Sequence, residues 1–339
     1  MDKLLDSARS KPIVGVTMGD PAGIGPEICA KALTSNEVQG VARCLVIGDR
    51  RFIRQGLKFA RIEGIEINSI KKVSEAKFIR FTIDVLDLNN ADPAKIKLGQ
   101  VSKPAGKAAF EYIERVIELA KNGEIDAIAT APINKEAIHR AGLKFDGHTE
   151  ILAARTRTKE YAMMFVSDRL WVMLATTHLP LMKVGKHLNK KKITRLIKLA
   201  HETLSRVRMK NPKIGVAGLN PHAGEAGIFG KEEIKIIRPA VEAAKKLGID
   251  VKGPISPDAI FYLANSGMFD LVIAMYHDQG LIPLKLISFN RSVNVTVGLP
   301  FVRTSVDHGT GFDIAGKGWA NPQSLIEAIK VAAHFTKSK

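Results

Sequence analysis

The sequence has few cysteines and no long hydrophobic run. Cys29 and Cys44 are the only cysteines among 339 residues, and they form no CxxC pair. A disulfide framework and a cysteine zinc site are therefore not expected, and both thiols are predicted to be buried. The longest apolar runs, such as residues 271–275, are much shorter than the ~18 residues of a membrane span, and residues 1–12 lack the apolar core of a signal peptide. These absences predict a soluble protein of the cytoplasm.

Acidic residues are also in short supply. The chain has 51 Lys and Arg against 34 Asp and Glu, which gives a formal net charge of +17. Its 45% hydrophobic and 25% charged residues are typical of globular proteins and exclude a disordered or collagen-like chain. At roughly 100 to 200 residues per domain, the length fits two domains or one large α/β unit.

Residues 183–213, called the basic segment below, hold more than half of the excess charge. They contain eleven Lys and Arg against one acid, Glu202, and apolar residues recur between them at helical spacing. The basic segment is therefore predicted to be an amphipathic helix with a basic outer face. No aromatic side chain interrupts the lysines, so the stacking platform of a single-strand binder is missing and a solvated face is favoured. A nucleic-acid or membrane-surface patch is the alternative, and a positive field would also favour an anionic substrate.

Short β-branched runs alternate with longer helical stretches along the chain. Helical periodicity is clearest at residues 105–122, 231–247 and 322–334, and Gly248 is a natural helix end. Strands are expected at Ile13–Met18, Cys44–Ile47, Ile125–Thr130, Trp171–Ala175, Ile214–Gly218 and Leu271–Met275. This alternation is typical of βαβ units and predicts an α/β fold with a largely parallel sheet.

Histidines follow three of these predicted strands. His178, His222 and His277 each lie just past the carboxyl end of a strand, where ligands bind in open α/β sheets. Three neutral imidazoles with an open position are a familiar arrangement for a divalent metal that polarises a substrate hydroxyl or carbonyl. Their spacings of 44 and 55 residues match no short metal motif, so a hydrogen-bonded loop position explains each single histidine about as well. Asp278 is placed to orient an imidazole, to assist proton transfer or to cap the following turn.

Two further segments are rich in glycine and polar residues. Residues 19–27 lack the GK[ST] of a P-loop and do not fit GxGxxG, so the stronger interpretation is a tight turn that presents Asp20 and backbone amides. In residues 147–150, His148 and Thr149 could donate to a phosphate or carboxylate, or the segment could cap a helix.

The C-terminal third carries the last candidates. Lys285 and Arg303 suit phosphate or carboxylate binding, Arg303 through its bidentate fork. Residues 307–310 could form a turn around the adenosine half of a dinucleotide, which makes Gly309 and Thr310 the candidates for cofactor binding. No serine nucleophile elbow accompanies this segment, so a hydrolase triad is not supported.

Seven motifs occur in order along most of the chain. They read VTMGDPAGIGPE (16–27), TAPINK (130–135), GHTE (147–150), ATTHLP (175–180), LNPHAGE (219–225), AMYHDQG (274–280) and GLPFVRTSVDHGT (298–310). Together they resemble the 4-hydroxythreonine-4-phosphate dehydrogenase (PdxA) family.

The resemblance implies an isocitrate/isopropylmalate dehydrogenase-like fold of two α/β domains with a cleft between them. The first domain would consist of residues 1–136 and 300–339. The second, residues 137–299, would carry most of the metal and substrate site and the dimer interface. The resemblance also implies a homodimer with shared active sites, NAD as cofactor, and one divalent metal ion per site, for which Zn, Mg and Co are candidates.

The resemblance also implies which residues do what. The family's metal ligands fall on His178, His222 and His277. Its substrate-binding residues fall on His148, Thr149, Lys285, Asn294 and Arg303. Asp278 and Lys285 are the candidates for the general base.

The implied reaction is the NAD-dependent oxidation and decarboxylation of 4-phosphohydroxy-L-threonine to 3-amino-2-oxopropyl phosphate and CO2, a step of pyridoxal 5′-phosphate biosynthesis. A branch of the same family resembles D-threonate or D-erythronate 4-phosphate dehydrogenases, and residues 160–163 and 312–316 lean toward that branch. A more distant alternative is a nucleic-acid-binding protein that uses the basic segment.

Overall fold

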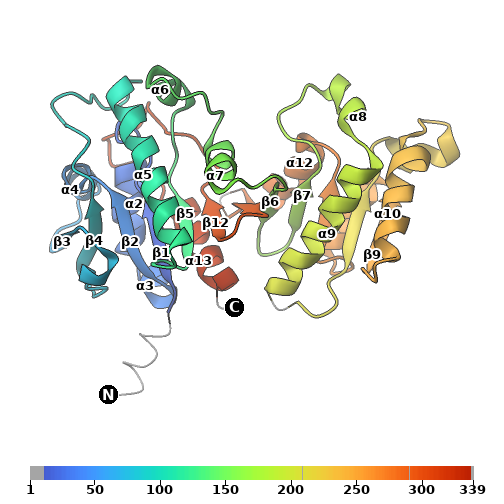
Figure 1. Ribbon diagram of the computed structural model, residues 1–339, viewed down its shortest axis with the longest axis horizontal. Helices are drawn as coiled ribbons and strands as arrows, with labels where there is room; N and C mark the ends of the chain where they lie inside the picture. The colour runs from blue at the N-terminus through green and yellow to red at the C-terminus, as the bar shows by residue number, and fades with distance from the viewer. Residues whose placement is uncertain (1–10, 208, 290, 337–339) are drawn as a thin grey trace, which may run out of the picture. The chain divides into compact units, whose positions relative to one another are not determined.

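The computed structural model describes residues 11–207, 209–289 and 291–336. Residues 1–10, for which we expect no signal peptide, and Arg208 of the basic segment lie outside this part. The described chain forms two compact α/β units (Figure 1). Unit 1 comprises the residues up to Lys159 and from Leu299 onward, and unit 2 comprises Glu160–Gly298. Among the described residues, no helix is both long and apolar enough to cross a membrane.

Unit 1 is built on parallel strands in the order β3-β4-β2-β1-β5-β12. The strands are β1 (Ile13–Thr17), β2 (Arg43–Gly48), β3 (Glu66–Ile70), β4 (Thr82–Asp87), β5 (Ala127–Thr130) and β12 (Val302–Ser305). β1, β2 and β5 confirm three of the predicted strands. The strands at the centre of the sheet are almost entirely buried, as expected when helices cover both faces.

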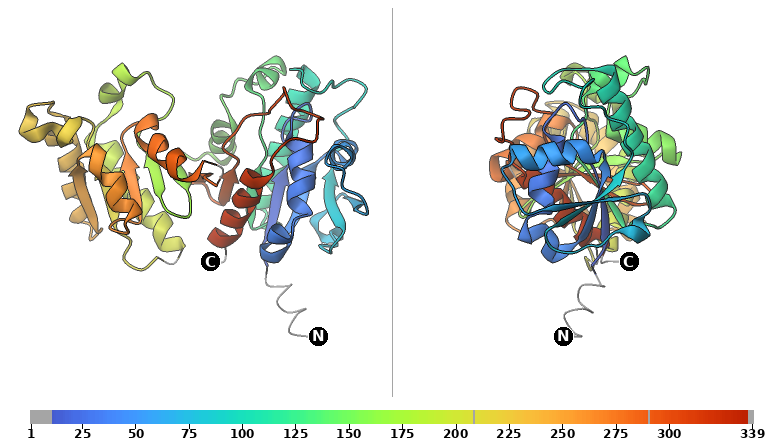
Figure 2. Two further views of the ribbon diagram at one scale, coloured as in Figure 1. Left: turned by 180° about the vertical axis from the view of Figure 1, so that it is seen from behind. Right: turned by 90° about the vertical axis from the view of Figure 1, so that its left-hand side faces the viewer.

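Two groups of helices cover the sheet of unit 1, one on each face (Figure 2). α5 (Lys103–Lys121) packs on β1 and β2 and confirms the predicted helix at 105–122; the Ser102 hydroxyl accepts a hydrogen bond from Ala105 N and so begins it. On the same side lie α6 (Lys135–Arg140) and α7 (His148–Thr156). The other group consists of α2 (Gly25–Leu33), α3 (Asn36–Val41), α4 (Arg50–Phe59) and α13 (Gln323–Thr336).

α6 and α7 place the first boundary between the units later than the sequence suggested. Both helices contact α5. Phe145, which lies between them, stacks on Phe110 of α5 with 6.0 Å between ring centroids. Residues 137–159, which the prediction assigned to the second domain, therefore belong to unit 1. His148 and Thr149 belong to unit 1 for the same reason.

Unit 2 has strands in the order β11-β6-β7-β10-β8-β9, of which β7, β10, β8 and β9 are parallel and β6 is antiparallel to both neighbours. They are β6 (Ala162–Val166), β7 (Trp171–Leu174), β8 (Ile214–Ala217), β9 (Val251–Ile255), β10 (Leu271–Ala274) and β11 (Val293–Val297). β7, β8 and β10 confirm the other three predicted strands. α9 (Lys190–Arg206) and α10 (Arg238–Lys245) lie on one face, and α11 (Pro257–Asn265) and α12 (His277–Ser288) lie on the other (Figures 1 and 2).

The helix predicted at 231–247 is not a regular α-helix throughout. It begins as a π-helical turn, Glu233–Ile237, and continues as α10, with Gly248 at φ 79° after its end. Pro239 accounts for the irregular start, because proline lacks a backbone N–H and its ring clashes with the carbonyl four residues earlier. The π-helical turn becomes important for the site, since Glu233 lies in it.

α9 confirms the amphipathic helix predicted in the basic segment. Its apolar residues Ile193, Ile197, Ala200 and Leu204 are buried, whereas Lys190 and Lys191 are exposed. The Asn189 side chain accepts a hydrogen bond from Lys192 N at 2.9 Å and so begins the helix.

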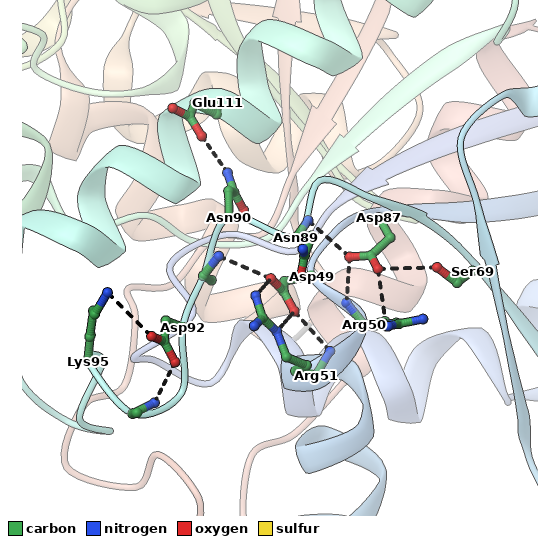
Figure 3. A network of polar contacts seen from close by, with 12 residues as sticks. Asp49, Arg50, Arg51, Ser69, Asp87, Asn89, Asn90, Asp92, Lys95 and Glu111 are labelled. Carbon is green, nitrogen blue, oxygen red and sulfur yellow. Dashed lines mark hydrogen bonds and ion pairs between the residues drawn. The ribbon is translucent and has the colours of Figure 1, made fainter.

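A network of charged residues at the carboxyl ends of β2 and β4 supports unit 1 (Figure 3). The buried carboxylate of Asp49 begins α4 and accepts from Arg51 Nε and Nη2 at 2.9 and 2.7 Å and from Ala91 N at 3.0 Å. Burial raises the pKa of Asp49, but the hydrogen bonds from Arg51 and Ala91 outweigh it and the pKa is lowered overall. Asp87 accepts from Arg50 N and Ser69 Oγ, both at 3.2 Å. Because nearby residues of unit 1 already hydrogen-bond to these carboxylates, we interpret the network as structural.

The chain changes direction across the sheet of unit 1 between β1 and β5. After β1 it forms β2, β3 and β4 on one side, and α5 then leads to β5 on the other side. Asp20 N, in the loop after β1, donates to Pro132 O, in the loop after β5, at 2.9 Å. Such a switch point is where ligands bind in open α/β sheets, at the carboxyl ends of the strands.

Candidate active site

Arg303 of β12 is the most buried cation among the candidates. It is 1% exposed, and its Nη2 donates to Thr130 Oγ1 of the neighbouring strand β5 at 2.8 Å. Thr130 Oγ1 in turn lies 3.0 Å from Ser305 Oγ. Burial lowers the pKa of Arg303 to about 9, and the charge of Glu150 raises it. The guanidinium therefore stays charged at neutral pH in an enclosed position, which suits an anion.

His148 and Thr149 form the first turn of α7. Burial lowers the pKa of His148 well below its usual range, and the positive charge of Arg303 lowers it further. The imidazole is therefore neutral at pH 7. Its Nε2 is enclosed and has no hydrogen-bond partner among the described residues, and Thr149 is 3% exposed. A free ring nitrogen, a helix start and a nearby guanidinium together suit a phosphate or carboxylate. The helix-capping interpretation of this segment is also correct in part, since α7 begins at His148.

Asp20 follows β1 at the switch point and is completely buried. Its Oδ1 accepts from Ala22 N at 2.8 Å, while its Oδ2 has no hydrogen-bond partner in the part of the chain that the structure describes. Burial raises the pKa of Asp20 to about 6, and the hydrogen bond from Ala22 lowers it by less. Because this pKa is higher in the folded chain than in the unfolded chain, protonation of Asp20 favours the folded state. Its contribution to the free energy of unfolding is present at acid pH and is lost as the pH rises through about 6.

We expect Asp20→Asn to raise the melting temperature at pH 8 but not at pH 4. The amide keeps the acceptor for Ala22 N and removes a buried negative charge, whose cost reaches about 3 kcal/mol for a pKa raised from ~3.9 to 6. Thermal unfolding at both pH values measures the effect, and Asp146→Asn is the control because its side chain is 72% exposed. An equal change at both pH values would contradict the role of the buried charge.

The predicted cofactor residues lie against the glycine-rich turn after β1. Ile24 N donates to Thr310 O at 2.9 Å, and a Cβ at Gly23 would lie only 2.7 Å from the same carbonyl. Gly309 is exposed and a Cβ there would meet nothing within 4 Å, so the backbone faces open space at this point. Two segments that the sequence analysis treated separately thus meet next to the switch point of unit 1.

Two of the three candidate metal ligands lie together in unit 2. The rings of His178 and His277 have centroids 5.9 Å apart. Two imidazoles bound to one ion at a tetrahedral angle, with a metal–nitrogen distance of ~2.1 Å, have centroids ~5.3 Å apart, so the spacing of this pair is close to what a shared divalent metal needs. His277 Nδ1 lies 2.6 Å from Asp278 Oδ1, which fixes the ring and leaves Nε2 for a ligand. Of the three roles considered for Asp278, the structure therefore favours orientation of the imidazole.

His222 lies in an unusual turn after β8. Residues His222, Ala223, Gly224, Glu225 and Ala226 all have φ between 38° and 80°, a left-handed conformation that costs L-residues roughly 1–2 kcal/mol each. The His222 ring is exposed and lies 6.1 Å from the ring of Phe229. Within the described residues, no three His, Cys, Asp or Glu side chains lie close enough to hold a metal ion. The third ligand therefore stays a prediction.

Lys285 and Asn294 complete the candidates of unit 2. Lys285 is half-buried on α12, with its Nζ 5.8 Å from the ring centroid of Phe289. Asn294 lies on β11, and its Oδ1 is buried with no hydrogen-bond partner among the described residues. An enclosed acceptor of this kind is available to a donor on a ligand.

Known proteins resemble this chain over nearly its whole length. A family model described as "Pyridoxal phosphate biosynthetic protein PdxA" matches residues 40–332. A Desulforapulum autotrophicum protein named 4-hydroxythreonine-4-phosphate dehydrogenase is 48% identical, covering 96% of this chain and 95% of that protein. A Clostridium botulinum protein with the provisional name D-threonate 4-phosphate dehydrogenase is 47% identical, covering 97% and 98%. The crystal structure of a 4-hydroxythreonine-4-phosphate dehydrogenase from Klebsiella pneumoniae matches with a TM-score of 0.91 at 46% identity, covering 96% of this chain and 98% of that chain.

Proposed function

Because this chain belongs to the PdxA family of pyridoxal phosphate biosynthetic proteins, we propose that it oxidises and decarboxylates 4-phosphohydroxy-L-threonine with NAD. The C3–H bond breaks and hydride passes to the nicotinamide, the hydroxyl proton leaves to a base, and the C1–C2 bond then breaks. CO2 departs, a proton takes its place on C2, and 3-amino-2-oxopropyl phosphate remains. The observation that supports this most is the enclosed Arg303 beside His148, because the substrate is an anion.

Arg303, His148 and Thr149 would hold an anionic group of the substrate. Arg303 offers a forked donor, and the neutral His148 donates or accepts through its enclosed Nε2. Asn294 would accept a hydrogen bond through Oδ1, and Lys285 would add a positive charge. Fixing the substrate in this way orients its reacting carbon.

His178, His222 and His277 would hold a divalent metal ion, Zn, Mg or Co. The pair His178 and His277 fits by its spacing, and His222 is included by the family resemblance. When bound, the metal would act as a Lewis acid on the substrate hydroxyl and on the charge that develops during decarboxylation. Asp278 would keep His277 in the tautomer that presents Nε2.

Lys285 is our candidate for the proton-transferring group. Asp278 was considered beside it, but its carboxylate is engaged by His277 Nδ1 at 2.6 Å. Lys285 lies two turns further along α12. As a general base, the Lys285 amine would take up the proton of the substrate hydroxyl while hydride leaves to NAD.

NAD would bind to unit 1 at the switch point between β1 and β5. The turn of Gly23 and Ile24 packs on Thr310, and the exposed Gly309 lets a ligand approach the backbone. The carboxyl ends of parallel strands at a switch point are the usual location for nucleotides in such folds.

D-threonate 4-phosphate is the second candidate substrate. A relative with that provisional name is 47% identical over 97% of this chain, so the comparison with relatives favours neither acid. The two substrates share the phosphate, the carboxylate and the oxidised hydroxyl, and differ in an amino group. The residues named above would therefore keep their roles with either acid.

We also propose that the protein works as a homodimer in the cytoplasm. Ile282 and Leu286 on α12 and Phe289 at its C-terminal end recur at helical spacing and are 67%, 85% and 71% exposed. An apolar stripe of this kind marks an interaction surface. A second copy of the chain is the partner that the family resemblance implies, and sedimentation of the purified protein tests its stoichiometry.

The assay that tests the function is NADH formation by the purified protein with NAD and a divalent metal, with the two phosphorylated acids supplied separately. We expect a preference of about 100-fold or more in kcat/KM for one acid, because the amino group of one acid and the hydroxyl in its place on the other differ in charge and in their hydrogen-bond donors. A preference for the amino acid supports the pyridoxal phosphate role, and a preference for the aldonate supports the second candidate. Absence of NAD reduction with both acids would contradict the dehydrogenase function.

A further inference from the structure

Three buried polar side chains lie at the edge of unit 2 from which the candidate metal ligands project. They are Thr176 at the end of β7, Gln279 on the first turn of α12, and Glu233 in the π-helical turn, and they are 3%, 8% and 1% exposed. None of them is a candidate ligand. Buried polar groups of this kind are retained where their hydrogen bonds determine a local arrangement.

Gln279 ties the ends of two neighbouring strands together. Its Oε1 accepts from Met275 N, after β10, at 2.6 Å, and its Nε2 donates to Gly218 O, after β8, at 2.7 Å. Thr176 Oγ1, after β7, donates to Met275 O at 2.7 Å. The three strand ends are thus connected by side-chain hydrogen bonds, and each leads within a few residues to His277, His222 or His178.

Glu233 holds the chain just before the left-handed turn. Its Oε1 accepts from Leu219 N and Asn220 N, both at 2.8 Å, and its Oε2 accepts from Asn220 Nδ2 at 3.0 Å. The carboxylate also fits closely against the turn, since a Cβ at Gly224 would lie 2.7 Å from Oε2. Any larger residue at position 224 would push Glu233 away.

The left-handed turn needs such support. Four of its five residues are not glycine, and positive φ angles are unfavourable for them. The turn therefore keeps this conformation only if contacts with the surrounding residues stabilise it. Glu233 supplies three acceptor contacts at the entrance to the turn, and hydrogen bonds from Ile228 N to Glu225 O and from Phe229 N to Gly224 O close its end. The position of the His222 ring therefore depends on Glu233.

We propose that Gln279 and Glu233 are positioning residues that fix the strand ends carrying His277 and His222. Gln279 sets the distance between the two ends, and Glu233 keeps the turn of His222 left-handed. This inference rests on the proposed function, because it assigns the positioned histidines to a metal.

Glu233→Gln is the first test, with Glu225→Gln as the matched control. Glu225 lies in the same turn but is exposed, so its replacement should change nothing. In Glu233→Gln the oxygen that accepts from Leu219 N and Asn220 N loses its charge, and the group that faces Asn220 Nδ2 becomes a second donor. Charged acceptors form stronger hydrogen bonds than neutral ones, so the metal-free protein should show about tenfold or faster hydrogen exchange at the amides of Leu219 and Asn220. Co²⁺ binding, followed by its visible absorption, should weaken about 10- to 100-fold, as for other residues that orient metal ligands.

A rescue experiment separates positioning from a general structural role. Glycine adopts positive φ without strain, so Ala223→Gly and Ala226→Gly, introduced together into Glu233→Gln, should restore part of the Co²⁺ affinity. In the wild-type background the same two changes should have little effect, because Glu233 already holds the turn. Gln279→Glu keeps the acceptor for Met275 N but removes the donor to Gly218 O, and we expect it to weaken Co²⁺ binding about tenfold.

The outcomes distinguish this inference from the proposed function. If Co²⁺ affinity falls in His222→Ala and in Glu233→Gln and recovers with the two glycines, the positioning role is supported. If it falls in His222→Ala but not in Glu233→Gln, the positioning role is wrong and the metal site stands. If His222→Ala binds Co²⁺ as the wild type does, the three-histidine site is wrong, and the positioning role that rests on it is overturned as well, whatever the hydrogen exchange shows.

Discussion

Replacing Arg303 with methionine is expected to lower kcat/KM about 10³-fold, which corresponds to about 4 kcal/mol of transition-state binding. Arg303 is 1% exposed and is held by Thr130 at 2.8 Å. An enclosed guanidinium meets little competition from water, so its hydrogen bonds to an anionic substrate would be strong. Steady-state NADH formation with each candidate acid measures the loss.

The same variant is expected to keep or raise its melting temperature. Burial lowers the pKa of Arg303 to about 9, and the charge of Glu150 raises it by less. The pKa of Arg303 is lower in the folded chain than its unfolded value of ~12.5 or more, so the buried charge destabilises the fold at neutral pH. This destabilisation disappears only as the pH rises from about 9 toward the unfolded pKa. Methionine removes the charge and keeps much of the volume, a change that often leaves a protein equally stable or more stable.

Arg140→Met is the matched control for Arg303→Met. Arg140 is also in unit 1, but its side chain is 54% exposed and pairs with Glu136 at 2.6 Å. An exposed ion pair contributes little, so neither activity nor melting temperature should change appreciably. Arg303→Lys keeps the charge without the fork and should lose about 10- to 100-fold in kcat/KM. Full activity in Arg303→Met would contradict the assignment of the anion site.

The strands of the central sheets are predictable because they are short runs of buried aliphatic residues. β10 consists wholly of such residues, and β1 and β5 consist mostly of them; the loops after these strands start where the runs end. β3 is harder to predict, because it is the edge strand of the sheet in unit 1 and most of its residues are polar or partly exposed.

β12 does not follow the same pattern, because it contains Arg303. Its sequence is VRTS, and a charged residue in the middle of four positions argues against a buried strand. Arg303 is nevertheless buried there, held by Thr130 of β5. The residue that obscures the strand in the sequence is thus the one that we propose for the anion site, and such a conflict is typical of functional positions.

The histidines were predictable as strand-end residues, but their local conformation was not. No intrinsic preference favours left-handed φ angles at Ala223, Glu225 and Ala226. Glu233 contacts that turn from a position that no motif marks, in a π-helical turn that the sequence pattern does not distinguish from an α-helix. Contacts between residues distant in sequence decide such features, so only the structure reveals them.

Replacing His178 or His277 with alanine is expected to remove the bound metal and to lower kcat/KM at least about 10³-fold. The two rings lie 5.9 Å apart, so loss of either one leaves a single imidazole of the pair, which holds a divalent ion weakly. Metal content after loading and dialysis gives a readout that is independent of activity. His187→Ala is the control, since His187 is exposed and its Nδ1 lies 2.8 Å from the backbone oxygen of Lys183, on the same helical turn.

Asp278→Asn and His222→Ala extend this test to the rest of the site. Asp278→Asn weakens the partner of His277 Nδ1 and should lower metal affinity about 10- to 100-fold while leaving the ligands in place. His222→Ala should abolish tight binding if three imidazoles share one ion, as the family resemblance implies. Full metal content and activity in His222→Ala would instead mean that the pair His178 and His277 suffices, with water or substrate as the remaining ligands. The described residues bring His178 and His277 together and hold His222 in a separate strained turn. His222→Ala therefore decides between a metal site of two histidines and one of three.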